Sequence, residues 1–341
     1  HRPINMALTP TNVAFTLAQN CHTTLRRIGM GPMPEEILQT HKLLDRCEKA
    51  LAERYTVHKL HEAADKEALI KSVAGKIRAV AGGNVDGALM DKLPKLEIIA
   101  NFGVGYDSID TKAAKQRNIR VTNTPNVLND AVAELTLGLM IGLARRIPQG
   151  DQFVRQGKWP KQSFPLLTEL NGKTVGILGL GRIGKEIATR CQAMKMRVVY
   201  HGRSRQHDEP YIFYDKLIDM ARDSDWLVII APGGKGTEKI VSRQVLEALG
   251  PEGFIVNVAR GTLIDEAAML ELLQSKKLGG AALDVFEKEP QVPEGFFALD
   301  NVVLSPHQGS ATHQTRNKMG DLVVANIVAH FAGEPLLSAV V

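Results

Sequence analysis

The sequence predicts an α/β protein of two Rossmann-like or flavodoxin-like domains, each built on a parallel sheet, and three observations lead to this prediction. Short apolar runs alternate with helical patterns from Leu25 onward. The runs are rich in β-branched residues and flanked by Gly or Pro, which is typical of strands that are buried on both faces. The alternation stops near residues 122–125 and starts again at Lys173, and 341 residues suffice for two domains.

The first alternation lies within residues 26–124. We expect strands at residues 27–30, 56–60, 77–81 and 97–100. We expect helices at residues 35–53, 65–73 and 86–92, and a further one from Asp110. Residues 1–25 have weak periodicity, and because the chain starts with His1 rather than Met they are interpreted as an N-terminal extension or a tag remnant.

The second alternation runs from Lys173 to Leu304, within a second domain expected at residues 125–310. A long apolar helix at residues 126–146 precedes it, and Pro148 is expected to end that helix. Residues 149–170 are expected to form a polar loop. The expected strands are 174–178, 197–200, 226–230, 254–257, 280–283 and 302–304, and a last amphipathic helix is expected at 311–331. The cleft between the two domains is the expected ligand site.

The composition argues against several classes of protein. Hydrophobic residues make up 44% and charged residues 23%, and no apolar run is long enough to cross a bilayer. The net charge of +5 comes without a dense Lys/Arg block, which disfavours a nucleic-acid partner. Cys21, Cys47 and Cys191 lie far apart, which disfavours a disulfide framework or a metal site. We therefore expect a cytoplasmic protein without a membrane or nucleic-acid partner.

A G-x-G-x-x-G motif at residues 179–184 follows an expected strand and opens an expected helix. Its first glycine permits a tight turn, its second lets the backbone approach a pyrophosphate, and its third lets the helix pack on the strand. Such glycines also occur in turns that merely pack tightly, but the strand–turn–helix context favours a dinucleotide, so residues 125–310 are expected to form a dinucleotide-binding Rossmann domain. The predicted cofactor contacts are Gly179, Leu180, Gly181, Arg182, Ile183 and Gly184.

The end of the next expected strand indicates which nicotinamide cofactor is preferred. A site for NAD(H) usually has an acidic residue there to bind the ribose hydroxyls, but this chain has Gly202. Arg203, Ser204 and Arg205 follow, and they can bind a 2′-phosphate through charge-assisted hydrogen bonds. A solvated basic loop is the alternative interpretation. We expect NADP(H) to be preferred, with NAD(H) also accepted.

Ionisable side chains follow three later strands. Arg260 follows residues 254–257, Asp284 and the glutamates Glu287 and Glu289 follow residues 280–283, and His307 follows residues 302–304. Each could be a surface ion pair, a solvated loop or a turn. Because ligands bind outside the carboxyl ends of parallel strands, we expect these groups to converge. An arginine can bind a carboxylate, and a histidine beside a carboxylate can donate a proton, so the set suits the reduction of a 2-keto acid.

With these motifs in order, the chain resembles the D-isomer-specific 2-hydroxyacid dehydrogenase family, and within it the glyoxylate/hydroxypyruvate and hydroxyphenylpyruvate reductase branch. The resemblance covers about residues 28–341. The segments that carry it are residues 102–107, 121–125, 179–184, 257–261, 282–290 and 306–307. One departure lies at residues 231–237, where three glycines and Lys235 replace the family's turn rich in Pro and Thr. Those glycines would loosen the adenosine side, or Lys235 would add a cation near the phosphates.

The resemblance implies a catalytic set of Arg260, Glu289 and His307. His307 would be the general acid in reduction and the base in oxidation. Glu289, rather than Glu287, would hold the imidazole, and Arg260 would bind and polarise the 2-keto acid.

The resemblance also implies contacts outside this set. Val258 and Asp284 would contact the cofactor, the latter at the nicotinamide carboxamide, and the backbone of Val104 and Gly105 would bind the substrate carboxylate together with Arg260 and His307. Gly82 and Gly83 are a weaker assignment to a substrate-facing loop. Residues 311–341 would complete the substrate domain of residues 26–124, and two subunits would pair through residues 126–170. Within that region Phe164 or Trp159 would close the pocket of the neighbouring subunit or simply pack the interface.

The expected function is the NADPH-preferring reduction of glyoxylate or hydroxypyruvate to D-2-hydroxy acids. Reduction of 2-ketogluconate or of an aryl pyruvate by the same family is the alternative. Enzymes for formate or phosphonate are disfavoured, since they would have an amide in place of Glu289 or a lysine near Val104. A dinucleotide-sensing scaffold like the C-terminal-binding-protein corepressors is the alternative from another class.

Overall fold

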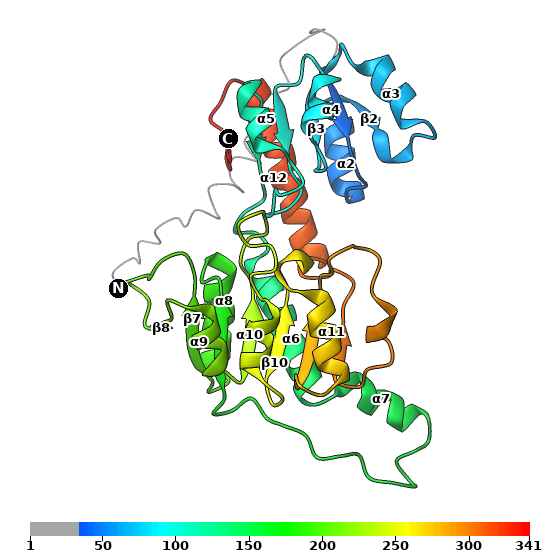
Figure 1. Cartoon of the computed structure of the whole chain (residues 1–341). Helices are drawn as coiled ribbons and strands as arrows, with labels where there is room; N and C mark the ends of the chain where they lie inside the picture. Colours follow the sequence, from blue (N-terminus) through cyan, green and yellow to red (C-terminus); the bar gives the residue numbers. More distant parts are fainter. Residues whose placement is uncertain (1–33) are drawn as a thin grey trace, which may run out of the picture. The chain divides into compact units, whose positions relative to one another are not determined.

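The computed structural model of the protein describes residues 34–341. The chain divides into two compact units. Of the described residues, the smaller unit contains residues 34–124 together with Met319–Val341, and the larger unit is Pro125–Lys318. Figure 1 follows the course of the chain. The strand expected at residues 27–30 and the extension expected at residues 1–25 lie outside the described part.

The smaller unit is built on a five-stranded parallel sheet with the order β2-β1-β3-β4-β5. Its strands are β1 (Glu36–Gln39), β2 (Thr56–Lys59), β3 (Ile77–Ala81), β4 (Ile98–Ala100) and β5 (Arg120–Thr122). Its helices are α2 (Asp45–Ala52), α3 (Lys66–Val73), α4 (Gly87–Asp91) and α5 (Thr111–Gln116), with a 3-10 turn at Leu60–Glu62. This strand order is that of flavodoxin-like folds.

Both faces of this sheet are buried. In β1 the neighbouring residues Ile37 and Leu38 are both fully buried, and they belong to two different hydrophobic clusters. One cluster includes Leu51 of α2 and Ile327 of α12 (His313–Phe331), and the other includes side chains of α3, α4 and α5. Since side chains alternate across a sheet, such continuous apolar runs are what a parallel sheet covered on both faces requires.

The helix expected at residues 35–53 is wrong in its first half. Residues Glu36–Gln39 form β1, which pairs with β2 on one side and β3 on the other, and the helix begins only at Asp45. Pairing on both sides and burial of two adjacent apolar residues outweigh the good helix propensity of Glu, Leu and Gln. Sequence reasoning also missed β5, because its sequence Arg-Val-Thr has a single apolar residue and so shows no apolar run.

The larger unit has a seven-stranded parallel sheet with the order β12-β11-β10-β9-β6-β7-β8. Its strands are β6 (Thr174–Leu178), β7 (Arg197–His201), β8 (Ile212–Phe213), β9 (Trp226–Ile229), β10 (Phe254–Asn257), β11 (Gly280–Leu283) and β12 (Val302–Leu304). The sheet grows in both directions from β6, as in a doubly wound dinucleotide-binding fold. The edge strand β8 was not predicted.

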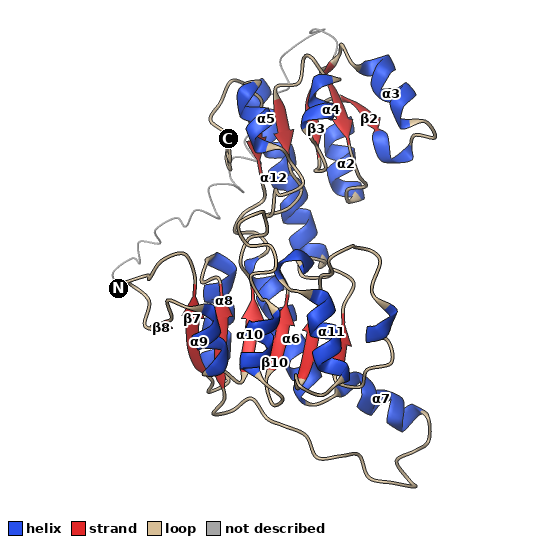
Figure 2. Ribbon diagram, in the orientation of Figure 1, coloured by secondary structure: helices blue, strands red, loops and turns tan. Residues whose placement is uncertain are grey.

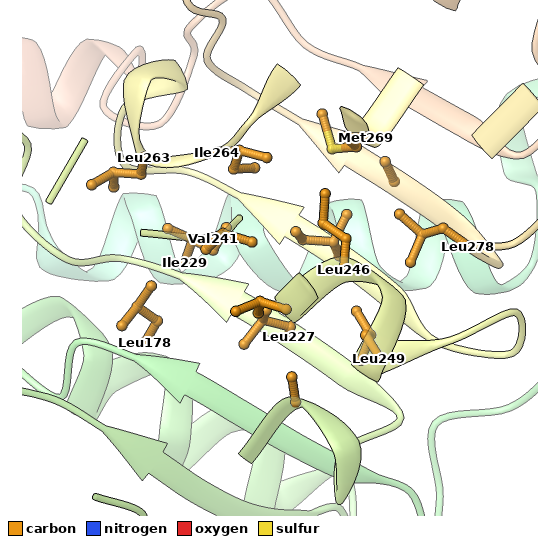
Figure 3. Close-up of a cluster of buried hydrophobic side chains, with 14 of the residues drawn as sticks. Leu178, Leu227, Ile229, Val241, Leu246, Leu249, Leu263, Ile264, Met269 and Leu278 are labelled. Carbon is orange, nitrogen blue, oxygen red and sulfur yellow. The ribbon is translucent and has the colours of Figure 1, made fainter. Parts of the chain in front are cut away.

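Helices cover both faces of this sheet (Figure 2). They are α6 (Asn129–Ala144), α7 (Ile147–Arg155), α8 (Arg182–Ala193), α9 (Leu217–Arg222), α10 (Arg243–Leu249) and α11 (Glu266–Gln274). Helix α6 packs on α8, and α10 packs on α9 and α11. A large cluster of buried side chains joins the second group of helices to the sheet, and its members include Leu246 of α10, Met269 of α11 and Ile229 of β9 (Figure 3).

Pro148 was expected to end the long apolar helix, but it lies near the start of the next helix. Helix α6 already ends at Ala144, and Pro148 lies in the first turn of α7, within a region that was expected to be a loop from residue 149. Proline is tolerated there because the N–H groups of a first turn have no acceptor within the helix. Within residues 34–341 the structure has no helix with the length and apolar character of a membrane span.

Candidate active site

Four loops of the larger unit leave the same edge of its sheet. They follow β6, β10, β11 and β12, which are all parallel, and the last three are direct neighbours. The glycine-rich loop follows β6, where the strand order reverses. Arg260 follows β10, Asp284 follows β11, and His307 follows β12. This arrangement brings the predicted cofactor loop and the predicted catalytic groups to the edge where ligands of doubly wound sheets bind.

The glycine-rich loop has the shape that a pyrophosphate requires. Gly179 has a φ of 102°, and a Cβ there would lie 2.8 Å from the backbone of Ala231. A Cβ on Gly184 would lie 2.2 Å from the carbonyl oxygen of Gly179. Gly181, which precedes the first residue of α8, faces open space within 4 Å. The first and third glycines thus serve packing, whereas the second leaves room at a helix N-terminus, so the residues present fit a dinucleotide.

The basic loop after β7 is attached to the glycine-rich loop. Arg203, Ser204 and Arg205 are exposed. The next residue, Gln206, donates from Nε2 to the carbonyl oxygen of Leu180 at 2.7 Å, and its backbone N–H donates to the Tyr200 hydroxyl at 2.7 Å. Sequence reasoning missed Gln206, since nothing local marks its partner. This hydrogen bond holds the loop that carries Arg203 and Arg205 next to the glycine-rich loop, which is the loop suited to the cofactor phosphates.

His307 and Glu289 form a hydrogen-bonded pair. Nδ1 of the imidazole lies 2.6 Å from Oε2 of Glu289, and Oε1 of Glu289 accepts from the N–H of Phe286 at 3.1 Å. The backbone N–H of Glu287 donates instead to Oε2 of Glu266 at 3.1 Å. Because Nδ1 is engaged, Nε2 is the ring nitrogen that can exchange a proton with a ligand. The His307 side chain is half exposed, which gives such a ligand access.

The carboxylate of Asp284 holds the loop that carries His307. It is 1% exposed and accepts three hydrogen bonds, from the Ser305 hydroxyl at 2.6 Å and from the N–H groups of Gln308 and Gly309 at 2.7 and 2.8 Å. Its backbone carbonyl accepts from the N–H of His307 at 2.9 Å. These contacts lie on both sides of His307, which has a φ of 52°. Asp284 therefore fixes the histidine loop, and its contact with the nicotinamide stays a prediction.

Arg260 lies on a turn that Asn257 closes. Nδ2 of Asn257 donates to the carbonyl oxygen of Arg260 at 2.9 Å, and Oδ1 accepts from the N–H of Ala259 at 3.1 Å. Asn257 was missed, although an asparagine at a strand end is a known turn signal. A Cβ on Gly233 would lie 2.9 Å from Cγ of Arg260. Among the three glycines after β9, Gly233 thus makes room for the stem of Arg260, whereas a Cβ on Gly234 or Gly236 would meet nothing within 4 Å. Val258, the remaining predicted cofactor contact, is buried in the same turn.

The loops after β10 and β11 touch backbone to backbone. A Cβ on Gly261 would lie 1.9 Å from the carbonyl carbon of Phe286, so only glycine fits. Glu266 adds the hydrogen bond to Glu287, and burial raises the pKa of its carboxyl group. Both residues were missed, because this contact depends on which strands are neighbours. The contacts set the position of the loop with Glu289 relative to the loop with Arg260.

The remaining predicted residues lie in the smaller unit. Val104 and Gly105 lie in the loop after β4, and Gly82 and Gly83 follow β3. Gly82 has a φ of 123°, and a Cβ there would lie 2.4 Å from the Thr40 hydroxyl oxygen. The predicted catalytic and cofactor residues of the larger unit therefore lie at one edge of its sheet. Val104 and these glycines follow strands of the smaller unit's sheet.

Metal and thiol chemistry find no support in residues 34–341. There, no group of three or more His, Cys, Asp and Glu side chains is placed to hold a metal ion. Cys47 and Cys191 are buried, and burial raises the pKa of each thiol to about 12. Because the thiolate is the reactive form, these two cysteines are poor nucleophiles.

Comparison with known proteins identifies the family. Residues 137–309 match the family model described as D-isomer specific 2-hydroxyacid dehydrogenase, NAD binding domain. A glyoxylate/hydroxypyruvate reductase A of Arabidopsis thaliana is 46% identical over 86% of this chain and 95% of its own length. The chain belongs to the D-isomer-specific 2-hydroxyacid dehydrogenase family. It is therefore an NAD(P)-dependent oxidoreductase that reduces keto acids, and the family prediction is confirmed.

Two further relatives of this 2-hydroxyacid dehydrogenase bear on its substrate and cofactor. A hydroxyphenylpyruvate reductase of Plectranthus scutellarioides is 47% identical over 79% of this chain and 87% of its own length. A solved structure of an NADPH-dependent glyoxylate/hydroxypyruvate reductase from Sinorhizobium meliloti, in complex with NADP and malonate, is 43% identical. It has a TM-score of 0.86 and covers 90% of this chain and 96% of its own. The predicted fold of two parallel-sheet domains is thereby confirmed.

The contact at Gly261 gives a first prediction. Gly261→Ala forces apart the loops that carry Arg260 and Glu289, so we expect keto-acid reduction to fall by about 10²-fold, a typical cost of a displacement of about 1 Å. The measurement is kcat under saturating substrate, with circular dichroism to show that the fold is retained. Gly75→Ala is the matched control, because a Cβ there meets nothing within 4 Å. Unchanged kcat in Gly261→Ala would show that this contact does not position the site.

Proposed function

We propose that this dehydrogenase reduces small 2-keto acids, glyoxylate and hydroxypyruvate foremost, to D-2-hydroxy acids, with NADPH as its preferred cofactor. The observation that carries the proposal is the 2.6 Å pair of His307 and Glu289, on the same sheet edge as Arg260 and the glycine-rich loop. The names of the Arabidopsis and Sinorhizobium relatives support the choice of substrate.

The proposed roles follow from the chemistry of each group. The guanidinium of Arg260 binds the 2-keto acid and polarises its carbonyl group. His307 donates a proton from Nε2 to the oxygen that becomes the hydroxyl group, while Glu289 orients the ring through its contact with Nδ1. When bound, the reduced nicotinamide supplies the hydride. The N–H groups of Val104 and Gly105 are assigned to the substrate carboxylate.

The cofactor contacts are proposed in the same way. The glycine-rich loop and the N-terminus of α8 hold the pyrophosphate, with Val258 and Asp284 on the nicotinamide side. Arg203, Ser204 and Arg205 hold the 2′-phosphate, since no carboxylate stands at Gly202 to repel it. The absence of that carboxylate also leaves NAD(H) as a weaker alternative.

We further propose that the protein is a homodimer that pairs through residues 126–170. Helix α7 in this region buries none of its side chains, and Trp159 and Leu166 are strongly exposed. Exposed apolar side chains in one region are typical of interaction surfaces. Phe164 packs against Phe153 with ring centroids 5.2 Å apart.

A second candidate substrate is an aryl pyruvate. The similarity to the Plectranthus hydroxyphenylpyruvate reductase favours it, at 47% identity. Both substrates need the same proton donor and the same arginine, so the ratio of kcat/KM for hydroxypyruvate and hydroxyphenylpyruvate decides between them.

The experiment that tests the function compares the wild-type protein with His307→Ala. We expect the wild type to oxidise NADPH steadily when glyoxylate or hydroxypyruvate is added. Because His307→Ala removes the proton donor, its kcat should be about 10²–10⁴-fold lower. The measurement is the loss of absorbance of the reduced nicotinamide.

Glu287→Gln is the control for this experiment. Glu287 is a glutamate on the same loop as Glu289, but the carboxylate that contacts the imidazole is that of Glu289. Its kcat should stay near the wild-type value. A wild type that oxidises no NADPH with any keto acid tested would remove the proposed function. Near-normal turnover by His307→Ala would remove His307 from the mechanism.

The basic loop gives a prediction on the cofactor. The double variant Arg203→Ala, Arg205→Ala loses the charge-assisted hydrogen bonds to the 2′-phosphate. We expect KM for NADPH to rise roughly 10–10²-fold and KM for NADH to change little. Arg222→Ala, which removes an exposed guanidinium from α9, should leave both values unchanged. Equal rises for the two cofactors would contradict the assignment.

A further inference from the structure

The side chain of one buried asparagine holds the loop after β4 through two hydrogen bonds. Asn101 is the first residue after the strand and is only 4% exposed. Its Nδ2 donates to the carbonyl oxygen of Gly103 at 3.0 Å and to that of Gly105 at 2.8 Å. Both hydrogens of one amide nitrogen are thus used on two carbonyl groups of the same loop.

The carbonyl group between these two is held as well. Nδ2 of Asn123, which follows the neighbouring strand β5, donates to the carbonyl oxygen of Val104 at 2.9 Å. The N–H of Thr124 adds a second donor to Gly103 at 3.0 Å. Three consecutive carbonyl groups, from Gly103 to Gly105, therefore point toward buried or half-buried donors of the sheet edge.

This arrangement determines where the N–H groups of the loop point. A peptide unit is planar and trans, so its N–H and its C=O point in opposite directions. Fixing the carbonyl of Gly103 directs the N–H of Val104 outward, and fixing the carbonyl of Val104 does the same for Gly105. Within residues 34–124 and 319–341, which make up the described part of the smaller unit, the structure provides no acceptor for either N–H. Adjacent outward N–H groups of this kind suit an anion.

We propose that Asn101 is a positioning residue, which orients the N–H groups of Val104 and Gly105 toward the carboxylate of the substrate. The inference rests on the proposed function, which assigns those two N–H groups to the keto acid. The hydrogen bonds of Asn101 explain why the N–H groups of Val104 and Gly105 are available to a ligand.

The residue type fits this role. Two donors on one small, uncharged buried group are what two carbonyl oxygens require; a carboxylate would repel them, and a hydroxyl group has a single hydrogen. The neighbouring loop leaves room for this amide, because a Cβ on Gly83 would lie 2.9 Å from Oδ1 of Asn101. Gly83 thus has a packing role beside the substrate-facing role expected for it.

The test uses Asn101→Asp, which keeps the shape of the side chain and removes both donors. We expect KM for glyoxylate and the dissociation constant of oxalate, a non-reacting dicarboxylate, each to rise about 10–10²-fold. The value of kcat should change by less than about threefold, and the dissociation constant of NADPH should not change, because the cofactor contacts lie in the larger unit. Calorimetry with NADP-saturated protein gives the oxalate value without turnover.

Two further variants keep the inference testable. Asn118→Asp is the matched control, an exposed asparagine in a turn of the same unit, and should change nothing. If Asn101→Asp does not fold, Asn101→Ser retains one donor and should give a smaller loss of oxalate affinity. Unchanged oxalate affinity, or a parallel loss of NADPH affinity, would overturn the inference.

The failure of this inference is separable from the failure of the proposed function. A wild-type protein that binds oxalate but reduces no keto acid would refute the proposed function, while the oxalate affinity of Asn101→Asp would still decide the role of Asn101. A wild-type protein that binds no oxalate would overturn the inference itself.

Discussion

The buried carboxylate of Asp284 is the interaction on which the rest of the candidate site depends. It lies at the end of β11, yet it fixes the loop of the next strand through Ser305, Gln308 and Gly309. Between these anchors His307 adopts a left-handed backbone, a conformation that costs on the order of 1–3 kcal/mol for a residue other than glycine. The hydrogen bonds of Asp284 offset that cost and leave the imidazole within reach of Glu289.

The same principle recurs at the other loops of the sheet edges. Asn257 closes the turn of Arg260, Gly261 and Glu266 join the loops after β10 and β11, and Asn101 holds the loop after β4. In each case a buried polar side chain or a close backbone contact fixes a loop whose neighbours carry the proposed chemistry. Groups that must meet a ligand are thereby supported by rigid strands and by hydrogen bonds behind them.

The sequence predicted those features that depend on local patterns. The strands of the larger unit other than β8, the glycine-rich loop, and the residues that follow β10, β11 and β12 all have short-range signals in the chain. The family followed from several such motifs in order. The errors in the fold arose where context outweighs propensity, as in β1, which the helical pattern of residues 35–53 concealed, and at Pro148, which begins a helix rather than ending one.

The supporting residues could not be predicted, because their partners are distant in sequence. Asp284 could be singled out at a strand end, but its three donors lie 21 to 25 residues away and become neighbours only through the sheet order. Asn101 and Glu266 have no local signal for the loops they hold. Substrate choice within the family depends on side chains around the keto acid, for which the sequence has no compact motif.

Amide hydrogen exchange in Asp284→Asn tests the central claim most directly. Replacing the carboxylate with an amide turns one acceptor oxygen into an NH2 donor. In the wild type both oxygens accept from N–H groups of the histidine loop, so the new donor faces another donor. We expect the backbone amides of Gln308 and Gly309 to exchange at least about tenfold faster than in the wild type, whereas Asp265→Asn, a change at the cap of α11, leaves them unaltered. Equal protection of these two amides in Asp284→Asn and in the wild type would contradict the claim that this carboxylate holds the histidine loop.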